Sequence, residues 1–158
     1  MMEQISIEGE KTLMEQVSGK VEKSFTLGKN ATLRALFIVR EAELTLHIEA
    51  VGVHSKAVIT CIFLSKNAEK IVANVSGNLV ADHAGVEIYL LSLLGDNADC
   101  QVDGGVTISP DIIKSSGHLR EENIVLGKKV KIKTLPMLDV RSSDVSASHG
   151  ATIDRLDE

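Results

Sequence analysis

The feature that most limits the fold of this chain is a short turn sequence that recurs among β-rich runs. Its four copies are residues 27–31 (LGKNA), 64–68 (LSKNA), 94–98 (LGDNA) and 126–130 (LGKKV). The leucines that open them are separated by 37, 30 and 32 residues. Similar turns at intervals of about 20–50 residues are typical of stacked coils, in which each coil buries its inner face against its neighbours. The repeat therefore predicts a β-solenoid.

The segments around these turns have the composition of strands. Seven short runs rich in β-branched residues are bounded by Gly, Asn, Asp or Ser, which indicates strands separated by tight turns: 31–39, 44–51, 57–64, 71–75, 85–94, 102–109 and 124–132. Aromatic residues make up only 3% of the chain although hydrophobic residues make up 44%. The predicted core is therefore built from Val, Ile, Leu and Ala in small repeated layers.

An antiparallel β-sandwich would contain a similar number of strands. Its hairpins would be expected to repeat the dipeptides Asn-Gly and Asp-Gly, yet Asp103-Gly104 is the single example in this sequence. The scarcity of these dipeptides favours the solenoid over the sandwich.

Length and composition predict one soluble domain over residues 1–158, in the cytoplasm. Two prolines and twelve scattered glycines leave no linker-like stretch. The apolar runs are far too short to span a membrane, and the N-terminus lacks the pattern of a secretory signal. Two cysteines, Cys61 and Cys100, are too few for a disulfide framework, which favours a reducing compartment.

Charge argues against nucleic acid as a partner. The net charge is −5, and neither sign forms a long block, whereas phosphate binding requires a clustered basic surface. The one basic run places Lys129, Lys131 and Lys133 on one face of a predicted strand, which we interpret as a solvated face that discourages edge pairing.

Catalytic motifs are absent, so the chain is predicted not to be an enzyme. Gly104-Gly105 lies in no dinucleotide or nucleotide loop, no G-x-S-x-G occurs, and neither cysteine has a neighbouring histidine. If an ATPase takes part in the function of this chain, it is therefore a different protein. A β-helical enzyme such as a sugar lyase would need clustered carboxylates that are not evident. The segment 115–118 (SSGH) is predicted to be a polar turn.

Of the five histidines, one lies in a setting suited to ligand binding. We expect His47 and His54 to be structural, and His83 as well, because Asp82 beside it would point to the opposite face of a strand. His149 lies among Ser, Ala and Gly in the segment 144–152 (DVSASHGAT), where little side-chain bulk surrounds it.

This segment, with Leu156-Asp157-Glu158 after it, resembles the D-V-x-C-S-H-G-A-T-x-G-x-L-D-E signature of the SufB/SufD family, scaffold components of the SUF iron–sulfur cluster assembly system. Ala147 stands where that signature commonly has cysteine. Four upstream segments resemble family segments in the same order and at the same spacing: 80–84 (VADHA), 103–108 (DGGVTI), 126–129 (LGKK) and 136–139 (PMLD).

The resemblance implies a right-handed parallel β-helix that acts as a scaffold, closer to SufD because it has His149 without the SufB-type cysteine. It implies that His149 is a metal ligand at a subunit interface and contacts a transient iron–sulfur cluster. A neutral imidazole is a competent iron ligand when its other nitrogen is hydrogen-bonded, and Asp144 and Ser148 are the candidate partners for that bond. The implied partners are a SufC-like ABC-type ATPase and a related SufB/SufD-like subunit or a second copy. The alternative is a structural or assembly module that kept the β-helix and lost the cluster chemistry.

Overall fold

The computed structural model describes residues 1–156 of the chain, and ten strands without any helix make up the regular structure of that range. The strands are β1 (Glu3–Ile7), β2 (Glu10–Leu27), β3 (Thr32–Ala50), β4 (Lys56–Ser65), β5 (Lys70–Leu79), β6 (Gly85–Leu94), β7 (Asp99–Ile108), β8 (Ser115–Val125), β9 (Lys131–Val140) and β10 (Val145–Arg155). Every strand pairing is parallel. The parallel pairing rules out the antiparallel sandwich.

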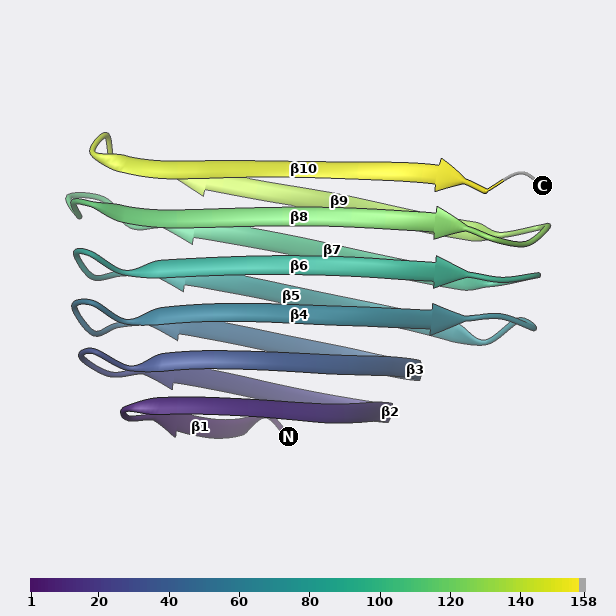
Figure 1. Ribbon diagram of the computed structural model, residues 1–158, viewed down its shortest axis with the longest axis horizontal. Coiled ribbons are helices and arrows are strands. Elements are labelled where there is room, and N and C mark those ends of the chain that lie inside the picture. The colour runs from purple at the N-terminus through teal and green to yellow at the C-terminus, as the bar shows by residue number, and fades with distance from the viewer. Residues whose placement is uncertain (157–158) are drawn as a thin grey trace.

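The strands wind around one axis as a flattened solenoid. In Figure 1 the near strands β4, β6, β8 and β10 run to the right, the far strands β5, β7 and β9 run to the left, and the chain rises from N- to C-terminus. Such a path is a right-handed coil. The predicted right-handed parallel β-helix is therefore confirmed. We call the near strands the front sheet and the far strands the rear sheet.

The first turns of the solenoid join the two sheets without a loop. The first part of β3 pairs with β4 in the front sheet, and its second part pairs with β5 in the rear sheet. β2 bends likewise at Gly19, where its register with β3 shifts. Positive φ angles of 71° at Gly19 and 42° at Glu41 produce these bends. The predicted separate strands 31–39 and 44–51 are thus two halves of one strand.

Alternation along each strand places one set of side chains in a shared core. Paired residues stack in register from coil to coil, as in the column Phe37, Cys61 and Leu90, all of which are buried. The core consists mainly of Val, Ile, Leu and Ala with three buried phenylalanines, as composition predicts: Phe25, Phe37 and Phe63.

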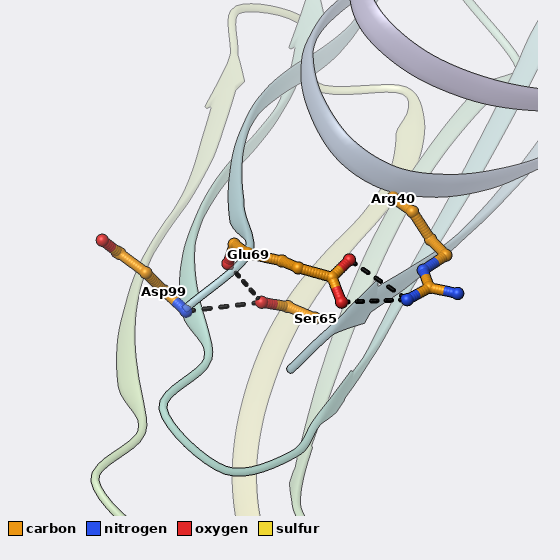
Figure 2. A network of polar contacts seen from close by, with 4 residues as sticks. All are labelled: Arg40, Ser65, Glu69 and Asp99. Carbon is orange, nitrogen blue, oxygen red and sulfur yellow. Dashed lines mark hydrogen bonds and ion pairs between the residues drawn. The ribbon is translucent and has the colours of Figure 1, made fainter. Parts of the chain in front are cut away.

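The corners stack because their backbone groups bond to the next coil. At one edge the amides of Asn67 and Asn97 donate to the carbonyls of Asp96 and Lys128, at 2.6 and 2.8 Å. Both asparagines have positive φ, 53° and 59°, a conformation that asparagine tolerates well. Figure 2 shows a polar network at this edge, where the Ser65 hydroxyl donates to the Glu69 carbonyl at 2.7 Å.

Three details of the sequence interpretation are corrected. The turn 27–31 lies between β2 and β3, at the edge opposite to the other three copies, so the 37-residue interval is not a coil length. Residues 124–132 are not one strand, because the chain turns between β8 and β9 and Lys129 has a φ of 57°. Residues 115–118 lie in β8 and not in a turn. The Ser115 hydroxyl is buried and donates a hydrogen bond to the Ala81 carbonyl at 2.7 Å.

No helix long and apolar enough to cross a membrane occurs in residues 1–156.

Candidate functional site

The C-terminal end of the solenoid is open within residues 1–156. β10 pairs with β8 in the front sheet, and no described strand follows it in the rear sheet (Figure 1). The side chains of β10 that point inward therefore lie over the last coil, and no described strand covers their other side.

His149 is one of these inward residues. It pairs with Leu119 of β8, which is buried, and paired residues of parallel strands point to the same side. Val145 and Ala147, which share its alternation phase, pack against the core. The side chain of His149 is nevertheless exposed. The ring thus faces the open end of the solenoid.

The two predicted hydrogen-bond partners of His149 are wrong. The Ser148 hydroxyl lies on the outer side of β10, where it bonds Nδ1 of His118 at 2.6 Å. The Asp144 carboxylate pairs with the Lys114 ammonium at 3.2 Å. Consecutive residues of a strand face opposite sides, so Ser148 is unable to orient the neighbouring imidazole.

Glu121 is a buried carboxylate near this end that sequence reasoning missed. It lies in β8 at an inward position, pairs with Ala151 of β10, and is 2% exposed. One carboxylate oxygen accepts a hydrogen bond from the Thr134 hydroxyl of β9, and the carboxylate also faces the Gly104 backbone amide, although Oε1 has no partner with full hydrogen-bond geometry. A buried carboxylate oxygen without a partner is unusual, because its desolvation is uncompensated.

The register brings this carboxylate near His149. Glu121 pairs with Ala151, and His149 is the next inward residue of the same strand. Diagonal neighbours on one side of a sheet lie roughly 7–8 Å apart at Cα, within reach of long side chains. The open end therefore combines an exposed imidazole with a buried carboxylate.

Replacement of Glu121 with glutamine is expected to remove a pH dependence of stability. Burial raises the pKa of the Glu121 carboxyl above its ordinary value of 4.5, so the folded chain keeps this proton where the unfolded chain has lost it. Stability contributed by the group is complete below pH 4.5 and falls as the pH rises through the folded-state pKa. Urea unfolding at about pH 4 and about pH 7 measures the difference.

The natural chain should lose more stability than Glu121→Gln between the two pH values. The matched control is Glu87→Gln, a change at an exposed outward position of β6. An equal loss of unfolding free energy in the natural chain and in Glu121→Gln would contradict the assignment of a buried carboxylic acid.

Neither cysteine contributes a thiolate to this end. Cys61 and Cys100 are buried in the core, and burial raises the pKa of each thiol to about 12. A protonated thiol in the core is a poor metal ligand. Within residues 1–156, no group of three His, Cys, Asp or Glu side chains is arranged to hold a metal ion.

The histidines expected to be structural make contacts within the solenoid. Nδ1 of His47 bonds the Ser76 hydroxyl at 2.8 Å on the outer side of the rear sheet. The rings of His54 and His83 stack with centroids 4.9 Å apart at successive corners. The Asp82 carboxylate accepts a hydrogen bond from the Ile113 amide at 2.9 Å, so it takes part in the contacts that join successive corners.

The strongest part of the sequence signature falls on β10, although Asp157 and Glu158 lie outside the described residues. The family model described as "SUF system FeS cluster assembly, SufBD core domain" matches residues 12–158. The iron–sulfur cluster assembly protein SufD of Escherichia coli (strain K12) is 30% identical over 67 residues. That match covers 42% of this chain and 16% of the SufD protein, so the chain spans a small part of this relative.

Proposed function

The chain belongs to the SufB/SufD family of SUF-system iron–sulfur cluster assembly proteins and is closer to SufD, and from this premise we propose that it is a minimal, non-catalytic scaffold. Its strand β10 takes part in holding a cluster under assembly. The observation that carries the proposal is the exposed, inward-facing His149 on the last strand.

The chemistry of this end suits a shared site. A neutral imidazole is a competent iron ligand. Thiolates are the usual ligands of iron–sulfur clusters, and both cysteines of this chain are buried. In our proposal a related SufB/SufD-like subunit, bound beside β10, supplies the thiolates.

We further propose that this assembly works with a SufC-like ABC-type ATPase. The SUF-system description of the family supports such a partner, and the absence of nucleotide-binding motifs in this sequence assigns ATP hydrolysis to another protein. Co-purification of the chain with a SufC-like protein is the expected result. Failure to co-purify while iron–sulfur maturation persists would remove this partner from the proposal.

Replacement of His149 with alanine is expected to abolish function and leave the fold intact. The ring is exposed, and surface substitutions away from special features usually change stability by no more than about 0.5 kcal/mol. The measurement is maturation of iron–sulfur enzymes in an Escherichia coli strain that lacks SufD and expresses this chain, with urea unfolding run in parallel.

His118→Ala is the matched control, because His118 lies on the outer side of the neighbouring strand and bonds Ser148. It should preserve enzyme maturation. Full maturation with His149→Ala would overturn the ligand role and favour a structural module that has lost cluster chemistry. Anaerobic reconstitution with iron and sulfide, with and without a SufB-like subunit, reads cluster retention directly by absorbance and iron content.

A further inference from the structure

The outer side of the rear sheet carries a chain of three hydrogen-bonded side chains. His47 of β3 lies opposite Ser76 of β5, and its Nδ1 is 2.8 Å from the Ser76 hydroxyl oxygen. Its Nε2 is 2.5 Å from Oε1 of Glu49, two residues further along β3. The three side chains share one side of the sheet, because paired residues, and residues two apart on a strand, point the same way. Serine hydroxyl, imidazole and carboxylate are therefore connected in that order.

Glu49 determines which ring nitrogen of His47 carries the proton. An ionised carboxylate only accepts hydrogen bonds, so Nε2 is the donor, and in the neutral ring Nδ1 accepts a hydrogen bond from the Ser76 hydroxyl. Asn78 holds the carboxylate in place, since its side-chain amide donates to Oε2 of Glu49 at 3.1 Å. The lone pair of Nδ1 is thus directed at the proton of a serine hydroxyl, which is the arrangement that activates a serine nucleophile.

A second serine–histidine pair in the same chain lacks the carboxylate. On the outer side of the front sheet, Nδ1 of His118 lies 2.6 Å from the Ser148 hydroxyl oxygen, and the two residues are again paired across neighbouring strands. Within residues 1–156, no carboxylate bonds the other ring nitrogen of His118. This pair has a base without a group that orients it, so it is an internal comparison for Ser76.

The surroundings of Ser76 leave room for an acyl group. Ser76 is partly exposed, and its partner on β7 is Gly105, which has no side chain. Beyond Gly105 lies Met137 of β9, which is 56% exposed and whose terminal methyl carbon would be 3.5 Å from a Cβ on Gly105. Asn74, the preceding outward residue of β5, has an exposed side-chain amide that can donate to a developing oxyanion. The site therefore offers space, an apolar contact and a hydrogen-bond donor beside the hydroxyl.

We propose that Ser76 is a modification site, at which the chain takes up an acyl group from an activated carboxylic ester or thioester. Oγ of Ser76 forms a bond to the acyl carbon, while the bond from that carbon to the leaving oxygen or sulfur breaks. His47 takes the serine proton as general base and passes it to the leaving group. Glu49 is a positioning residue that orients the ring and stabilises the imidazolium. The product is one serine ester per chain, formed without the participation of His149.

The test is the reaction of the full chain with a fluorophosphonate probe, followed by intact-mass measurement and peptide mapping. This probe reports activated serine hydroxyls, because an O–P bond forms, the P–F bond breaks with loss of fluoride, and the serine proton passes through the base to solvent. One adduct is expected at Ser76, formed at least about a hundredfold faster than any adduct at Ser148. In a parallel reaction, phenyl thioacetate should place one acetyl group on Ser76 and release thiophenol.

Substitutions separate activation of the hydroxyl from folding. His47→Gln should slow labelling about a hundredfold, because it removes the general base. Glu49→Gln should slow labelling at least about tenfold, because the glutamine amide can donate to Nε2 and favour the tautomer with its proton on Nδ1. Thr45→Ala, at the preceding outward position of β3, is the matched control and should react at the natural rate. Circular dichroism verifies that each variant folds.

Four results would overturn the proposal, and two of them require only the natural chain and the fluorophosphonate. These two are the lack of any adduct and equal labelling of Ser76 and Ser148. The third is acetylation by phenyl thioacetate that is confined to lysine side chains. The fourth is an unchanged labelling rate in folded Glu49→Gln, which would show that the hydrogen bond to His47 contributes to the structure of the sheet alone.

Discussion

Replacing Phe63 with alanine is expected to lower the free energy of unfolding by about 3–5 kcal/mol. Phe63 is fully buried on β4, between Val39 and Ser92 of the adjacent coils. The loss combines the transfer free energy of the ring with the cavity left behind. Stacked coils above and below are held by continuous hydrogen-bond ladders, so the site is poorly able to collapse around the smaller side chain.

Urea unfolding checks this value as a fall in the midpoint with an unchanged slope. Met14→Ala is the control, because Met14 is 69% exposed on the outer side of β2. It should change the unfolding free energy by no more than about 0.5 kcal/mol. A loss below about 1 kcal/mol for Phe63→Ala would contradict the tightly packed interior described above.

A single methyl group at Gly52 is expected to destabilise the chain by about 3 kcal/mol or more. A Cβ built on Gly52 would lie 2.1 Å from both the Gly28 carbonyl carbon and the Lys29 amide nitrogen. These are backbone atoms of the preceding corner, and the Gly52 amide donates to the Leu27 carbonyl at 3.0 Å. Relief of the clash therefore requires separation of two stacked corners.

The measurement is thermal or urea unfolding of Gly52→Ala beside Gly150→Ala. A Cβ on Gly150 would meet nothing within 4 Å, so this control isolates steric contact from the general effect of removing a glycine. Equal stability of the two variants would show that the corners do not approach as closely as described. Gly127 provides a second instance at the opposite edge, since its Cβ would lie 2.2 Å from the Asp96 amide nitrogen.

Alternation and the turn repeat predicted a β-solenoid, and the family resemblance supplied its right-handed, parallel winding. The run 85–94 coincides with β6, and 57–64 lies within β4, because alternating apolar residues bounded by turn residues are local signals. Asn67 and Asn97 indicated corners for a local reason as well: asparagine tolerates the positive φ that these turns need. The signature around His149 was likewise legible without a structure, and it coincides with the last strand.

Tertiary structure decided which side each residue faces and which corner each turn forms. Glu121 lies between two charged residues, Arg120 and Glu122, yet it is buried because its strand register aligns it with Leu90 of the adjacent coil. The one available signal in the sequence was that the apolar residues Leu119 and Val125 lie two and four residues away. They share the alternation of Glu121, which indicates that its side chain points inward.

The same dependence on distant pairing explains the remaining differences. The turn at residues 27–31 has a sequence similar to that of the other three copies. It lies at the opposite edge of the solenoid because β2 and β3 each bend from one sheet into the other. The position of His149 at an uncovered end, diagonal to Glu121, follows from pairing between strands about thirty residues apart. Local sequence determines the shape of a strand or corner. The stacking of the coils determines which residues lie beside that strand or corner, and therefore which interactions its side chains make.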